Sequence, residues 1–143
     1  MPKMKLIADV NIKVLVVEDD MELASMIEHD LHKAGFEVVT VGRGIEARDV
    51  LQEEEFDLVI CDWKLPDFGG LDLLGFVRQR YGIPFVLMTG FSDFIQSQDV
   101  YESGAAVFLS KPFNRTVLHS AVSQALGLEA AATVSLQEVL KRQ

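Results

Sequence analysis

Six polar side chains lie where predicted strands end, and as a group they could bind and accept a phosphoryl group. The residues are Glu18, Asp19 and Asp20 after the apolar run 12–17, Asp62 after 58–61, Thr89 after 85–88, and Lys111 shortly after 106–109. Several carboxylates in a small region repel one another unless a cation lies between them. Carboxylate oxygens suit a hard divalent ion such as Mg²⁺, whereas a hydroxyl and an ammonium suit phosphoryl oxygens. A carboxylate held in line could accept a phosphoryl group as an acyl phosphate.

The elements that must position these side chains alternate along the chain. We predict strands at 12–17, 36–41, 58–61, 85–88 and 106–109, followed in turn by helices at 21–34, 45–53, 71–81, 93–103 and 114–126. Apolar runs as continuous as 58–61 are typical of strands buried on both faces. Short strand-to-helix loops favour a parallel sheet with helices on both faces. All strands then end at one edge of the sheet, where ligands bind in such folds.

Composition narrows the class of protein. The 143 residues suffice for one domain with a real core, 49% of them are apolar, and the net charge is −9. With no basic cluster, we expect no nucleic-acid binding by this domain. Without an apolar run of about 18 residues we expect no membrane segment, and the start of the chain lacks a secretory signal. The sequence therefore predicts a cytoplasmic domain.

We place the domain at residues 12–126 and interpret 127–143 as a linker with a small extra helix or the start of a connector. Within that tail, Ser135 and Glu138 have capping-box spacing. The single cysteine, Cys61, lies in a predicted buried strand and is interpreted as a small apolar residue.

Four motifs, in order, resemble a known family. They are Val14-Leu15-Val16-Val17-Glu18-Asp19-Asp20, Asp62-Trp63-Lys64-Leu65-Pro66-Asp67, Thr89-Gly90 and Lys111-Pro112-Phe113. From about Lys13 to Leu126 the chain closely resembles the receiver domain of bacterial two-component response regulators. The resemblance implies a flavodoxin-like sheet of order 2-1-3-4-5. It implies a signalling module rather than an enzyme, apart from its own phosphoryl transfer and dephosphorylation.

The same resemblance assigns a phosphorylation site and a metal site. Asp62 would be the phospho-acceptor. The cofactor would be Mg²⁺ or Mn²⁺, bound by Asp62, directly by Asp19, through water by Glu18, and by the backbone carbonyl of Lys64. For Asp20 two interpretations stay open. It belongs to the acidic group formed with Glu18, Asp19 and Asp62, or it is only a charge at a helix N-terminus.

The resemblance also implies a switch. Thr89 and Lys111 would contact the phosphoryl group, and the bond from Lys111 to Pro112 would be cis, a geometry that proline permits. Phe108 occupies the position of an aromatic residue that moves inward on activation.

The partners implied are a histidine kinase or a histidine phosphotransfer protein upstream, and a downstream target or a homodimer. The second contact would use the face of the predicted fourth helix. Phe94 and Tyr101 are spaced to lie exposed on that helix, where exposed aromatic residues indicate an interface; incidental exposure is the alternative. The sequence does not identify the kinase, the stimulus or the output.

Three other functions compete with this interpretation. The first is a receiver-shaped interaction module that takes no phosphate. The second is a nucleotide-binding oxidoreductase fragment, because residues 42–47 fit the pattern G-x-G-x-x-A after a strand. The third is an aspartate-nucleophile phosphatase, a class that typically has a second Asp where this chain has Lys64. His29 and His32 are expected on a solvated helix face, and His119 is expected in the last helix with no acidic neighbour.

Overall fold

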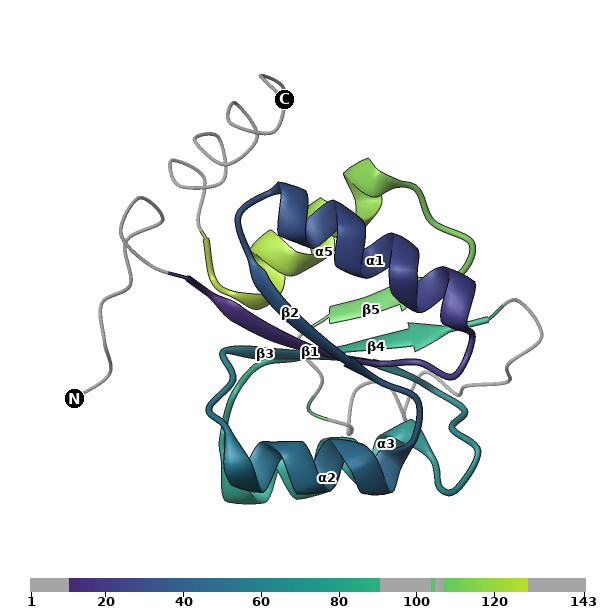
Figure 1. The fold of residues 1–143 in the computed structure, drawn as a ribbon, viewed down its shortest axis with the longest axis vertical. Coiled ribbons are helices and arrows are strands. Elements are labelled where there is room, and N and C mark those ends of the chain that lie inside the picture. Colours follow the sequence, from purple (N-terminus) through teal and green to yellow (C-terminus); the bar gives the residue numbers. More distant parts are fainter. Residues whose placement is uncertain (1–10, 91–103, 105–106, 129–143) are drawn as a thin grey trace.

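A five-stranded parallel sheet forms the centre of the molecule in a computed structural model, which describes residues 11–90, 104 and 107–128 (Figure 1). The strands are β1 (Lys13–Val17), β2 (Glu37–Val41), β3 (Leu58–Asp62), β4 (Phe85–Thr89) and β5 (Val107–Ser110). The helices described are α1 (Met21–Lys33), α2 (Gly44–Glu53), α3 (Gly70–Arg80) and α5 (Arg115–Ala125). The order β2-β1-β3-β4-β5 confirms the predicted flavodoxin-like fold. The predicted helix 93–103, with Phe94 and Tyr101, and the tail 129–143 lie outside the described residues.

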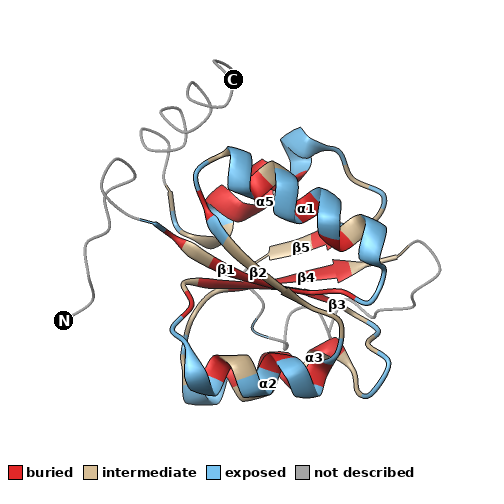
Figure 2. Ribbon diagram, viewed as in Figure 1, coloured by how far each residue is buried: buried red, intermediate tan, exposed pale blue. Residues whose placement is uncertain are grey.

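Helices cover both faces of the sheet and leave its three central strands, β1, β3 and β4, buried between two apolar layers, whereas the edge strands β2 and β5 are partly exposed (Figure 2). Val14 and Val16 of β1 join the layer beneath α1 and α5, whereas Leu15 and Val17 join the layer above α2 and α3. Side chains along a strand alternate between its faces, so a strand covered on both sides must be apolar throughout. This arrangement explains the continuous apolar runs of the sequence. None of the helices in the described part of the chain is both long and apolar enough to cross a membrane.

Three strands, β3, β4 and β5, end one residue later than the sequence predicts, and the extensions of β3 and β4 reach the site. Asp62 is the last residue of β3 and pairs with Met88, and Thr89 is the last residue of β4 and pairs with Ser110. Pairing with a parallel neighbour continues until the chain turns away, so a polar side chain does not by itself end a strand. The backbones of both residues are therefore fixed by the sheet.

Candidate functional site

Three carboxylates meet at the carboxyl edge of the sheet. One oxygen each from Glu18, Asp19 and Asp62 lies within 4.8 Å of the others. Glu18 and Asp19 directly follow β1, and the amide of Glu18 donates to the carbonyl of Val41 at 3.0 Å, which continues the pairing with β2. β1 and β3 are hydrogen-bonded neighbours, so their ends bring the carboxylates together, as the sequence predicts.

These carboxylates differ in exposure. Glu18 and Asp62 are 3% and 7% exposed, whereas Asp19 faces solvent. Burial raises the pKa of Glu18 above its ordinary value, and the nearby charge of Asp62 adds to the rise, although Lys111 and the amide of Asp20 oppose it. A cluster with buried inner oxygens and one exposed carboxylate can bind a small cation that enters from solvent.

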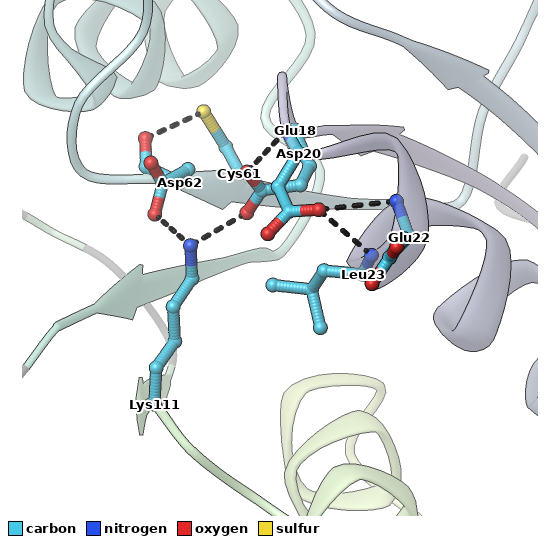
Figure 3. A network of polar contacts seen from close by, with 7 residues as sticks. All are labelled: Glu18, Asp20, Glu22, Leu23, Cys61, Asp62 and Lys111. Atoms are coloured by element: carbon cyan, nitrogen blue, oxygen red, sulfur yellow. Dashed lines mark hydrogen bonds and ion pairs between the residues drawn. The ribbon is translucent and has the colours of Figure 1, made fainter.

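Lys111 reaches between the two buried carboxylates (Figure 3). Its Nζ lies 2.7 Å from Oε1 of Glu18 and 2.7 Å from Oδ1 of Asp62. Burial alone would lower the pKa of Lys111, but the hydrogen bonds to Asp62 and Glu18 outweigh it and the pKa is raised. The lysine therefore stays an ammonium and balances part of the negative charge.

Thr89 is joined to the lysine through the backbone, because the amide of Lys111 donates to the carbonyl oxygen of Thr89 at 2.7 Å. The next bond, from Lys111 to Pro112, is cis. Phe108 pairs with Leu87 in the sheet and is half-buried against the layer of α2 and α3. The strand ends thus place Thr89 and Lys111 at the same edge as Asp62.

Asp20 belongs to helix α1 rather than to the acidic group. Its Oδ1 accepts hydrogen bonds from the amides of Glu22 at 3.0 Å and Leu23 at 3.2 Å, which makes it the N-cap residue (Figure 3). Of the two interpretations left open by the sequence, the structure supports the helix N-terminus.

The Gly42–Ala47 pattern has a structural explanation that does not involve a nucleotide. The first amides of α2, those of Gly44 and Ile45, are bound by the carboxylate of Asp67 at 2.9 and 2.8 Å. The ring of Phe68 lies against Gly44 where a Cβ would be. A pyrophosphate would need these same amides, and they are taken.

The loop after Asp62 contains two features that sequence reasoning missed. One is the role of Asp67 just described. The other is Gly70, where a Cβ would overlap the carbonyl oxygen of Asp62 and lie 2.9 Å from Cδ1 of Leu87. The Gly69-Gly70 pair was the available signal, but it indicates only a turn.

The cysteine and two of the three histidines agree with the sequence interpretation, whereas His119 does not. Cys61 is buried, burial raises its pKa well above the ordinary value, and its thiol donates to the carbonyl of Asp62 at 3.2 Å. His29 and His32 are exposed. The expectation for His119 was wrong: Asp30 of α1 is an acidic neighbour. The spacing within one helix does not reveal a charge that packs from another.

A doubly covered parallel sheet with an acidic group and a lysine at its carboxyl edge defines a receiver-type signalling domain. The sequence model of the response regulator receiver domain matches residues 14–123. The chain belongs to this family of two-component signalling domains.

Characterised relatives share this domain but are longer. The response regulator protein FleR of Pseudomonas aeruginosa is 39% identical over 117 residues, which cover 80% of this chain and 25% of FleR. The DNA-binding response regulator MtrA of Mycobacterium tuberculosis is 36% identical over 101 residues, 71% of this chain and 44% of MtrA. The chain thus spans less than half the length of these relatives.

Solved structures extend the likeness to three dimensions. The chemotaxis response regulator CheY4 of Vibrio cholerae superposes with a TM-score of 0.76 at 32% identity, covering 82% of this chain and all of CheY4. A putative response regulator from Chloroflexus aurantiacus gives a TM-score of 0.75 at 32% identity over 82% of this chain and 99% of the other.

Proposed function

We propose that this domain accepts a phosphoryl group on Asp62 from the phosphohistidine of a histidine kinase or a histidine phosphotransfer protein, in the cytoplasm. The observation that carries the proposal is the position of Asp62 at the end of β3, in the acidic group and 2.7 Å from the ammonium of Lys111. The side chain of Asp62 retains 10% exposure, so a phosphoryl donor can reach its carboxylate. The membership of this chain in the response regulator receiver family supports the same conclusion.

The donor set fits a bound Mg²⁺ or Mn²⁺. Glu18, Asp19 and Asp62 supply only oxygen ligands, which hard divalent cations prefer. Asp62 and Asp19 would bind the ion directly, Glu18 through water, and the backbone carbonyl of Lys64 would complete the protein ligands. The ion would neutralise charge on the phosphoryl oxygens during transfer.

Transfer forms one bond and breaks another. A carboxylate oxygen of Asp62 attacks phosphorus, the bond from phosphorus to the histidine nitrogen breaks, and its electron pair stays on the imidazole, which takes up a proton. Lys111, whose ammonium lies 2.7 Å from Asp62, would pair with the incoming oxygens, and the hydroxyl of Thr89 would donate to one of them. The chain's own contribution is to hold the nucleophile and to offset charge.

The output follows from the new charge. Phosphorylation adds negative charge and strong hydrogen-bond acceptors beside Thr89, which would draw Thr89 and Phe108 inward and shift a pre-existing equilibrium of conformations. The surface that responds would be the face of the predicted fourth helix, with Phe94 and Tyr101 contacting a downstream target or a second copy. MtrA is named as a DNA-binding response regulator, whereas we assign no nucleic acid to this domain.

The test is incubation of the purified protein with a small acyl phosphate and Mg²⁺, followed by intact-mass measurement. We expect a mass gain of one phosphoryl group that EDTA prevents and Asp62→Asn abolishes. Asp57→Asn, a change in the residue directly before β3, is the matched control and should be labelled like the wild type. If the wild type gains no mass, the phosphate-independent interaction module becomes the better interpretation.

A further inference from the structure

The loop between β3 and α3 has a fixed shape. Lys64 and Gly69 form an antiparallel bridge across it, and the amide of Gly70 donates to the carbonyl of Trp63 at 2.8 Å. Because Gly70 also packs directly on the carbonyl of Asp62, the loop leaves and rejoins the fold at the phospho-acceptor. Its orientation beyond these points depends on what else it contacts.

Asp67 supplies that further contact. Its Oδ1 accepts from the amide of Gly44 at 2.9 Å and from the amide of Phe68 at 3.1 Å, and its Oδ2 accepts from Ile45 at 2.8 Å. The residue at the N-cap position of α2, Arg43, makes no side-chain capping bond. A carboxylate from a different loop thus performs the capping that helices usually obtain from their own chain.

Apolar packing strengthens the attachment. The ring of Phe68 lies so close to Gly44 that three of its atoms would be no more than 2.7 Å from a Cβ there. Glycine at position 44 is therefore what allows the loop to approach α2. Together, Asp67 and Phe68 fasten the loop to the start of α2 by hydrogen bonds and by contact.

The turn before α2 also contacts the acidic loop that follows β1. The amide of Glu18 donates to Val41, and a Cβ on Gly42 would lie 3.9 Å from both the Glu18 carbonyl and the Asp19 Cα. The segment 42–45, which comprises the turn and the start of α2, therefore lies against both loops that carry the proposed metal ligands. We therefore expect a change in its attachment to one loop to alter the relative position of the two loops.

We propose that Asp67 is a positioning residue that fastens the β3–α3 loop to the N-terminus of α2 and so holds the Lys64 carbonyl in place for the metal. This inference rests on the proposed function, because it assigns Asp67 a role in the same site. Residues that orient metal ligands without touching the ion typically change affinity by about 10–100-fold when removed. We expect Asp67→Ala to weaken Mg²⁺ binding by about 10-fold on that basis.

The experiment is a Mg²⁺ titration of the full chain followed by the fluorescence of Trp63, the single tryptophan and the neighbour of Asp62. Asp67→Ala removes both acceptors, Asp67→Asn keeps one at nearly the same volume, and Gly44→Ala displaces Phe68 while leaving Asp67 present. Asp49→Ala, an exposed carboxylate of α2, is the control for loss of charge.

We expect dissociation constants in the order Asp67→Ala above Asp67→Asn above wild type, with Gly44→Ala raised and Asp49→Ala unchanged. Saturating Mg²⁺ should restore the phosphorylation rate of Asp67→Ala, because the nucleophile itself is intact. A purely structural role would lower the unfolding midpoint but leave the dissociation constant within about twofold of the Asp49→Ala value, and that result overturns the inference alone. Failure of the wild type to bind Mg²⁺ overturns the proposed function and this inference together.

Discussion

The ammonium of Lys111 lies 2.7 Å from the carboxylate of Asp62, the residue proposed to accept phosphate. The same ammonium contacts Glu18, so one cation offsets two carboxylates that are almost completely shielded from water. Without a bound metal, the ammonium of Lys111 offsets part of this negative charge. Metal and lysine should therefore be partly interchangeable as stabilising cations.

Lys111→Met tests this relation. Removing one partner of a buried charge pair leaves the other charge buried and unpaired. This lowers the free energy of unfolding by about 3–5 kcal/mol when burial is complete. Lys111 retains 24% side-chain exposure, so we expect a loss of about 1–3 kcal/mol in unfolding free energy without metal. Mg²⁺ should recover most of the loss, measured by urea unfolding with and without the ion. Lys33→Met on the exposed side of α1 should change little. An equal deficit with and without Mg²⁺ would contradict the interpretation.

Asp19 and Asp20 offer a matched comparison for the metal site. Asp19 belongs to the acidic group, whereas Asp20 caps α1. We expect Asp19→Asn to abolish most of the stabilisation that Mg²⁺ gives by binding the native state, seen as a smaller rise in unfolding midpoint. Asp20→Asn removes the same charge one residue along and keeps a good N-cap, so it should respond to Mg²⁺ like the wild type. The assignment fails if the two variants behave alike.

The sequence predicted much of this architecture because the sheet is covered on both faces, which forces apolar runs ending in polar residues. It therefore located Asp62, Thr89 and Lys111 at one edge without knowledge of any contact. It left Asp20 open, since an aspartate after a strand serves equally as a cap or as a ligand. It missed the role of Asp67 because the amides that this residue binds are 22 and 23 residues away. Only the folded chain brings them together.

Gly70→Ala should be destabilising in a way that Gly75→Ala is not. At Gly70 a methyl group would overlap the carbonyl of Asp62, and overpacking of this kind costs about 1–3 kcal/mol. At Gly75, on the same helix, nothing lies within 4 Å of the Cβ position, so alanine should stabilise the helix by about 0.5–1 kcal/mol. Urea unfolding of both variants measures the difference. Similar effects of the two substitutions would show that Gly70 does not pack as described.

Protonation of His119 should destabilise the contact between α5 and α1. The residue is 7% exposed, and its Nε2 has no hydrogen-bond partner among the described residues. Burial lowers the pKa of His119 below its ordinary value of 6.5, while the charge of Asp30 raises it somewhat and that of Arg115 lowers it. Because the unfolded chain then binds the proton more readily, this residue's contribution to stability is complete above pH 6.5 and is lost as the pH falls through the folded-state pKa.

His119→Gln removes the titration and should flatten this part of the pH dependence. We expect the wild type to lose stability relative to His119→Gln below pH 6.5, with a slope no steeper than about 1.4 kcal/mol per pH unit for one proton. Urea unfolding in EDTA at a series of pH values measures the difference. Glu18, whose raised pKa acts in the opposite direction, is present in both proteins and cancels. His32→Gln, at an exposed position of α1, should follow the wild type. Parallel pH profiles for the wild type and His119→Gln would show that His119 is not held neutral by its surroundings.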